Sequence, residues 1–254
     1  MATYQEFLPT RRLARYIECY WSSVDRNGAR CESVLPDGCV DILYSARGGE
    51  PIDVSLVGLM TVRQLIDVES GVSLFGVRFR PGMAAAFFPD APQLIDRTER
   101  IESVMGAGAR TILEQLSESS SPASMAQIFD AFLRPLEPPD MRETVMHQLT
   151  VSGMPLDRAA TEAGLSVRHL RRLCQEMSGV PPKYLARIIR FRNAANRIAT
   201  LATAPAQPDW AQFAIACGYY DQAHLIREFQ EFARCTPGRY LQYAVNRDSL
   251  VSRS

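Results

Sequence analysis

The sequence predicts an α+β N-terminal domain followed by an all-α C-terminal domain. Short apolar runs with strand character lie in the front half, whereas the back half consists of helical segments separated by glycine and proline. Three prolines fall within residues 135–140, where a helix cannot continue. The charge changes sign at the same place. Residues 1–140 hold 13 Arg against 19 acidic residues, whereas residues 141–254 hold 14 Arg and one Lys against 9 acidic residues.

The length of 254 residues fits two domains of ordinary size. We expect an N-terminal domain at 1–135, a Pro-rich linker at 136–140, a helical domain at 141–243 and a C-terminal tail at 244–254. With 46% hydrophobic and 22% charged residues, disordered, collagen-like and disulfide-knot classes are excluded. No apolar run reaches the ~18 residues of a membrane span, and no signal peptide is recognisable, so we expect a cytoplasmic protein without a membrane partner.

In the front half, local patterns predict each element in turn. Leu13, Tyr16, Ile17 and Tyr20 recur at three- and four-residue spacings, which predicts a helix over Thr10–Tyr20. The turn dipeptide Asp37-Gly38 precedes a strand. The remaining elements are strands at Cys39–Tyr44, Val54–Val57, Gln64–Val68 and Val72–Arg80, and helices at Met83–Phe88, Ile101–Leu116 and Pro122–Leu133.

In the back half, glycine and proline divide the chain into seven predicted helices. They are Met141–Thr150, Leu156–Ala163, Val167–Glu176, Pro182–Ala202, Pro208–Cys217, Asp221–Phe232 and Pro237–Tyr243.

This half also contains an internal repeat. Ala160-x-x-x-Gly164 recurs as Ala214-x-x-x-Gly218 at an offset of 54 residues. The segment that begins His169-Leu170-x-Arg172 recurs 55 residues later as His224-Leu225-x-Arg227, and Pro182 recurs as Pro237. Two copies at a fixed spacing predict two similar supersecondary units.

Each unit has the pattern of a helix-turn-helix. A small Ala marks the close contact, a Gly the sharp turn, and Ser166 or Asp221 the N-cap of the second helix. That second helix has one apolar stripe and one polar, basic face, and a helix of this kind fits the DNA major groove. The segment Pro182–Ala202 is a connector whose 21 residues give roughly 31 Å as a helix, compatible with reading heads in successive major grooves. The alternative is a pair of helical hairpins that merely pack together; two capped copies in register argue against it.

Residues 141–243 resemble the twin helix-turn-helix domain of AraC/XylS-type transcriptional regulators. The second copy, IACGYYDQAHLIREFQEFARCTP (215–237), follows the family signature, and the first copy follows a looser form of it. One residue departs, since Arg234 stands where the family usually has Gly. The resemblance implies DNA contacts by the exposed positions of the two second helices. They are Arg168, Arg171 and Arg172 in the first head, and Gln222, Ala223, Ile226 and Arg227 in the second, with His169 and His224 as phosphate contacts or packing residues.

The front half is similar to a poorly defined N-terminal domain that often accompanies such regulators. The matching segments are LPDGCVDILYS (35–45), Leu56-Val57-Gly58 and FGVRFRPG (75–82). We expect this domain to bind an effector or to dimerise. Arg78 and Arg80 lie two apart on a predicted strand and share a face, so an anionic effector could bind them. A solvated strand face is the alternative that we favour.

No feature indicates catalysis, a cofactor or a metal site. Cys19, Cys31 and Cys39 have poor zinc spacing, and all three histidines lie in the back half. The six cysteines are expected to be reduced thiols. No Gly-rich phosphate loop and no nucleophile elbow is present. We therefore expect a regulator rather than an enzyme; the alternative is a DNA-targeted enzyme with a catalytic N-terminal domain.

The resemblance also implies the partners. They are double-stranded DNA at a promoter or operator, RNA polymerase if the protein is an activator, a small-molecule effector, and a second copy of the chain if the regulator is a homodimer.

Overall fold

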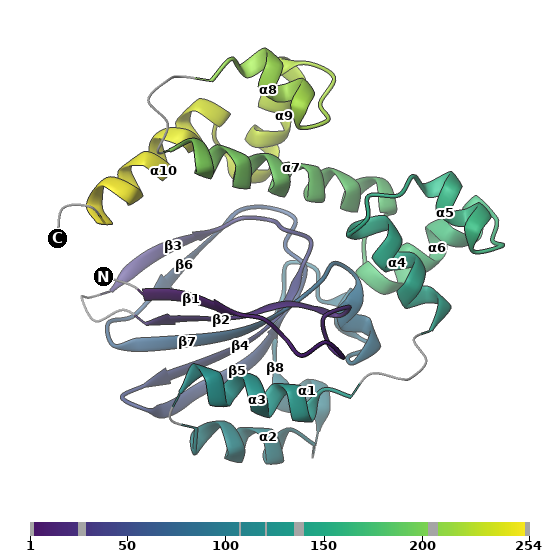
Figure 1. Ribbon diagram of the computed structural model, residues 1–254. Coiled ribbons are helices and arrows are strands. Elements are labelled where there is room, and N and C mark those ends of the chain that lie inside the picture. Colours follow the sequence, from purple (N-terminus) through teal and green to yellow (C-terminus); the bar gives the residue numbers. More distant parts are fainter. Residues whose placement is uncertain are drawn as a thin grey trace.

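The computed structural model describes residues 3–24, 29–106, 108–119, 121–134, 140–202 and 208–251. A sheet-rich N-terminal region lies beneath the long helix α7 (Pro182–Leu201), and two groups of helices lie toward its two ends (Figure 1). The first group is α4 (Met141–Thr150), α5 (Leu156–Glu162) and α6 (Val167–Ser178), and the second is α8 (Trp210–Ala216), α9 (Gln222–Ala233) and α10 (Pro237–Val251). The predicted order of an α+β region followed by a helical region is confirmed.

The N-terminal region is built on a six-stranded antiparallel sheet. Its strands lie in the order β1 (Thr3–Phe7), β2 (Ile17–Val24), β7 (Val72–Phe79), β4 (Val40–Arg47), β5 (Glu50–Val57) and β8 (Thr98–Arg100). A separate two-stranded sheet pairs β3 (Arg30–Val34) with β6 (Gln64–Val68). Along β4 the apolar residues Val40, Ile42, Tyr44 and Ala46 are buried and the residues between them are half-buried, as expected for a strand with one core-facing side.

The helix predicted over Thr10–Tyr20 is wrong. Residues 11–16 form only a turn, closed by hydrogen bonds such as Ile17 N–H to the Leu13 carbonyl, and the chain then enters β2. This strand pairs on both sides, with β1 and with β7. The apolar spacing fits a helix locally, but two rows of strand pairing outweigh that local preference.

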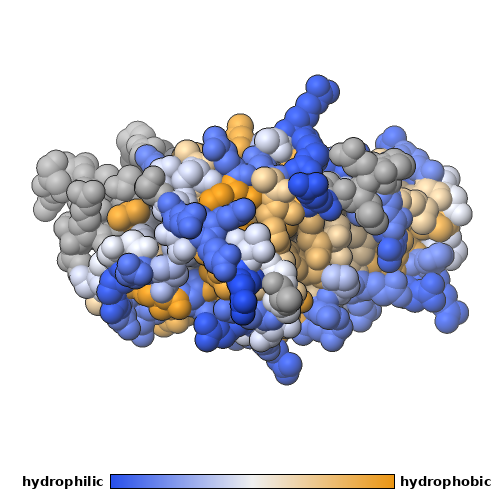
Figure 2. All heavy atoms as spheres, turned by 90° about the horizontal axis from the view of Figure 1, so that it is seen from below, coloured by the Kyte–Doolittle hydropathy of each residue, from blue (hydrophilic) through white to orange (hydrophobic). Residues whose placement is uncertain are grey.

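Three helices cover one face of the sheet. The helix expected over Ile101–Leu116 is divided into α1 (Ile101–Met105) and α2 (Gly108–Ser117). A capping box between Ser121 and Ser124 begins α3 (Pro122–Phe132), and Phe129 of this helix stacks on Phe75 of β7 at 5.9 Å between ring centroids. Seen from below, hydrophobic atoms lie between hydrophilic ones on this side of the molecule (Figure 2).

Most other predicted elements are confirmed within a few residues. The segment Met83–Phe88 contains a short 3-10 helix, η1 (Met83–Ala86), and a second, η2 (Ala91–Gln93), follows it. Of the expected linker 136–140, residues 136–139 lie outside the described residues, and Asp140 is the N-cap of α4. Helix α10 continues to Val251, through most of the expected tail. Buried apolar side chains from both regions form one continuous cluster, so the sheet and the helical region share a core.

Candidate nucleic-acid interface

The first helix-turn-helix unit consists of α5 and α6. Ala160 is 2% exposed at the close contact, and Gly164 turns the chain with a φ of 66°, a left-handed conformation that favours glycine. The Ser166 hydroxyl accepts a hydrogen bond from the backbone N–H of His169 at 3.1 Å, which caps α6. The predicted turn and cap are both confirmed here.

The second unit, α8 and α9, repeats this arrangement. Ala214 is fully buried, and Gly218 has a φ of 78°. The Asp221 carboxylate accepts a hydrogen bond from the backbone N–H of His224 at 2.6 Å and so caps α9. Equivalent residues therefore perform equivalent local roles in both copies, as the repeat predicts.

Most of the predicted DNA contacts lie on exposed helix faces. In α6, Arg168, His169, Arg171 and Arg172 are all exposed, and the only ion pair recorded among these described residues joins Arg172 to Glu176 at 3.4 Å. In α9, Gln222, Ala223 and Arg227 are exposed, whereas His224 and Ile226 are half-buried. The exposed face of each helix therefore presents polar and basic side chains to solvent.

The His224 side chain contacts other residues of its own unit, whereas the His169 side chain is exposed. Its Nε2 lies 3.5 Å from Glu228 Oε1, and its Nδ1 accepts a hydrogen bond from the backbone N–H of Tyr220 at 3.4 Å. Its ring also meets Tyr219 edge-on, with 5.2 Å between ring centroids. These contacts favour the packing role for His224, while the exposed His169 is available for a phosphate.

Helix α9 is fixed to α7 by a buried carboxylate. The Glu228 side chain is 3% exposed, and its Oε1 accepts hydrogen bonds from Arg187 at 2.9 Å and from Arg190 at 2.6 Å. Arg187 also pairs with Glu231, and the Arg190 guanidinium lies over the Tyr219 ring at 4.9 Å. This cluster ties α9 to α7.

Sequence reasoning did not find this cluster. The available signal is an acidic residue on the apolar stripe of α9, since Glu228 stands between the buried residues Leu225 and Phe232 and next to Phe229. Burial of a carboxylate demands a cationic partner. The sequence alone does not say which of the 27 arginines supplies it.

The N-terminal region contacts α4, α9 and the connector helix α7. Tyr16 donates a hydrogen bond to the buried Glu143 of α4 at 2.7 Å, and the backbone N–H of Arg63 donates to the Phe232 carbonyl at the end of α9 at 3.1 Å. In the middle of α7, Arg192 pairs with Glu18 and lies 3.6 Å from the Cys39 sulfur. The N-terminal region is therefore joined to helices on both sides of α7 and to α7 itself.

Arg78 and Arg80 are both engaged inside the protein. The Arg78 guanidinium lies 3.5 Å from the carboxylates of Asp37 and Asp41, and Arg80 Nε donates to the Ala14 carbonyl at 3.0 Å. Burial raises the pKa of Asp41 to about 6, although the positive charge of Arg78 acts in the opposite direction. The guanidinium of Arg78 thus already has two anionic partners.

The described residues contain no group of three or more His, Cys, Asp or Glu side chains placed to hold a metal ion. Their six cysteines are free thiols, and burial raises the pKa of Cys174 to about 11 and that of Cys19 to about 12. Within the same described part of the chain, no helix is both long and apolar enough to cross a bilayer.

Comparison with known proteins identifies two domains. Residues 159–243 match a helix-turn-helix domain, and residues 5–99 match a domain of unknown function, DUF6597. Comparison with curated protein sequences gives no match.

Among solved structures, ToxT from Vibrio cholerae O395 is similar at 11% identity and a TM-score of 0.43, covering 89% of this chain and 98% of that one. A ToxT variant from Vibrio cholerae strain SCE256 is similar at 13% identity and a TM-score of 0.43, covering 87% and 96% of the two chains. The helix-turn-helix match spans both copies of the repeat. The chain therefore carries an AraC-type helix-turn-helix domain at residues 159–243, preceded by a DUF6597 domain at residues 5–99.

Proposed function

We propose that this protein is a sequence-specific DNA-binding transcriptional regulator of the AraC type. The observation that carries the proposal is the pair of capped helices, α6 and α9, whose polar faces are exposed while their apolar faces are buried. The excess of six positive charges in residues 141–254 favours a polyanionic partner.

The two helices would enter successive major grooves on one face of the duplex. Helix α7 has 20 residues and is about 30 Å long at the ordinary helical rise, close to the ~34–36 Å between such grooves. In the first head, the base contacts would come from Arg168, Arg171 and Arg172, with His169 on a phosphate. In the second head they would come from Gln222, Ala223, Ile226 and Arg227.

The N-terminal domain, residues 1–135, would bind an effector or mediate dimerisation, and residues 141–243 would bind DNA. The contacts from Tyr16, Arg63 and Glu18 to three different helices give this domain a direct means of changing the relation between the heads. Promoter or operator DNA is the principal partner, and RNA polymerase would be a further one if the protein activates transcription.

The test is selection of bound duplexes from a random pool by the full-length protein, followed by footprinting. We expect a non-palindromic site with two protected major-groove patches about 10 base pairs apart, and a strong decrease in affinity with salt. Arg158→Gln, on the exposed side of α5, is a control that alters charge outside the predicted contacts. Failure to enrich any sequence over random DNA would contradict the proposal, and a single protected groove would contradict the two-headed arrangement.

A further inference from the structure

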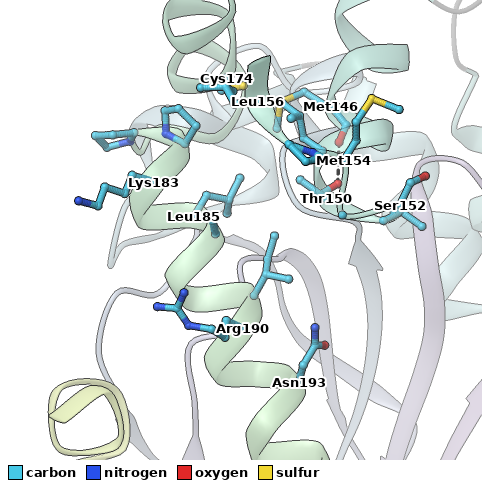
Figure 3. A pocket seen from close by; sticks show the side chains of 18 of the residues that line it. Met146, Thr150, Ser152, Met154, Leu156, Cys174, Lys183, Leu185, Arg190 and Asn193 are labelled. Carbon is cyan, nitrogen blue, oxygen red and sulfur yellow. Dashed lines mark hydrogen bonds between the residues drawn. The ribbon is translucent and has the colours of Figure 1, made fainter. Parts of the chain in front are cut away.

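A cavity of about 900 Å³ that is open to solvent lies in the helical region, between α7 and the helices α4 to α6, and Arg171 and Lys183 are exposed where they line it. Helix α7 forms one side, and the loop from Thr150 to Leu156 forms the other (Figure 3). Side chains of α4 and α6 lie between them, represented by Met146 and Cys174. The volume falls within the range of small-molecule sites, ~300–1,000 Å³.

The walls of the cavity are aliphatic and sulfur-containing. The apolar residues that line it include Met146, Leu149, Met154, Leu156 and Ile189. Among the described residues that line the cavity, none is aromatic and none is acidic. Flexible Met and Leu side chains adapt to an alkyl group, whereas the lack of a ring removes the stacking that would select a flat aromatic molecule.

Three cations line the same cavity, namely Arg171, Lys183 and Arg190. Lys183 is the single lysine of the chain. Within the described part of the protein, no carboxylate lies within ion-pair distance of Lys183 or Arg171, whereas Arg190 is paired with Glu228. An apolar cavity with two uncompensated cations and no acid favours a ligand with an alkyl body and an anionic head.

We propose that this cavity binds an amphiphilic aliphatic anion, with its head at Lys183 and Arg171 and its chain between the Met and Leu side chains. The inference about regulation rests on the proposed function, because Arg171 is also a predicted base contact of α6. A ligand that occupies Arg171 therefore competes with DNA for that side chain, and it also joins the first reading head to the connector.

The first experiment measures ligand binding by the full chain without DNA, using decanoate below its micellar concentration as the probe. NMR of methionine methyl groups labelled with carbon-13 reports on the cavity directly, because Met146 and Met154 line it. We expect saturable shifts at these two methyl groups. Lys183→Gln should weaken decanoate at least tenfold, whereas Lys183→Arg, which keeps the charge, should stay within about threefold of the unchanged protein.

Matched probes and a matched variant test the roles of the cations and of the apolar walls separately. Arg158→Gln removes an exposed positive charge outside the cavity and should leave decanoate binding unchanged. Decanol that binds as tightly as decanoate would overturn the role of the cations. Inorganic phosphate that binds as tightly would overturn the role of the apolar walls. Shifts spread over all nine methionines, or an unchanged affinity in Lys183→Gln, would overturn the site itself.

The second experiment adds DNA selected by the protein. Saturating decanoate should weaken the specific complex at least fivefold, and Lys183→Gln should lose most of that effect. An unchanged DNA affinity in the presence of bound decanoate would overturn the competition. If no specific DNA exists, the proposed function fails while the decanoate result stands, so the two failures are distinguishable.

Discussion

The buried carboxylate of Glu228 offers a sharp test of how α9 is held against α7. Glu228→Gln keeps the shape but removes the charge that neutralises Arg187 and Arg190. Removing one partner of a buried ion pair costs ~3–5 kcal/mol. Here the two arginine side chains are 28% and 27% exposed, and Arg187 retains Glu231, so water and the second acid compensate in part. We therefore expect a loss of about 2–3 kcal/mol in the free energy of unfolding.

Glu231→Gln is the matched control, because it removes the same charge from the same cluster. Glu231 is 43% exposed, and among the described residues its one ion pair is with Arg187, so its loss should cost at most ~1 kcal/mol. Urea unfolding followed by circular dichroism measures both variants, and hydrogen exchange of the α9 amides shows whether the loss is local. A cost in Glu228→Gln no larger than that in Glu231→Gln would refute the reasoning that burial makes this pair different.

Three further predictions concern the reading helices and the sheet. Arg172→Ala and Arg227→Ala should each lose about 1–3 kcal/mol of binding free energy at the preferred site and relax specificity at different positions, measured by repeated site selection; a uniform loss on all sequences would instead indicate phosphate contacts. Arg234 ends α9 with a φ of 57°, a left-handed conformation unfavourable for residues other than glycine, so Arg234→Gly should raise the unfolding free energy by about 1 kcal/mol, and a lower urea midpoint would contradict this. The pKa of Asp41 is raised from 3.8 to about 6 in the folded protein. The contribution of Asp41 to the free energy of unfolding is therefore complete below pH 3.8 and is lost as the pH rises through 6. The stability of the unchanged protein relative to Asp41→Asn should therefore fall between pH 4 and 7, and a constant difference between the two unfolding curves would argue against burial as the cause.

Local signals in the sequence were sufficient to predict the helices, turns and caps of the C-terminal half. The spacing of apolar residues, the glycines at the turns and the caps at Ser166 and Asp221 all act within a few residues of one another. The duplicated pattern then predicted two equivalent units, and their exposed faces follow from helical periodicity. Arg234 stands where the family usually has glycine, and its left-handed conformation supplies the physical reason why glycine is usual there.

The front half was less predictable because strands depend on distant partners. The strands β1, β3 and β8 have no strong local signal, and each exists through pairing with a segment elsewhere in the chain. The helix expected over Thr10–Tyr20 failed for the same reason, since β2 is stabilised by two neighbouring strands.

Only the tertiary structure decided how the sheet region and the two helix-turn-helix units are joined. The cluster around Glu228 unites residues about 40 positions apart, and the contact of Glu18 with Arg192 spans 174 positions. The same is true of the cavity, where Lys183 on α7 lies across from the loop at Thr150. Periodicity shows which side of a helix is exposed, but charge pairing and cavities depend on which surfaces meet, and that is fixed by packing over the whole chain.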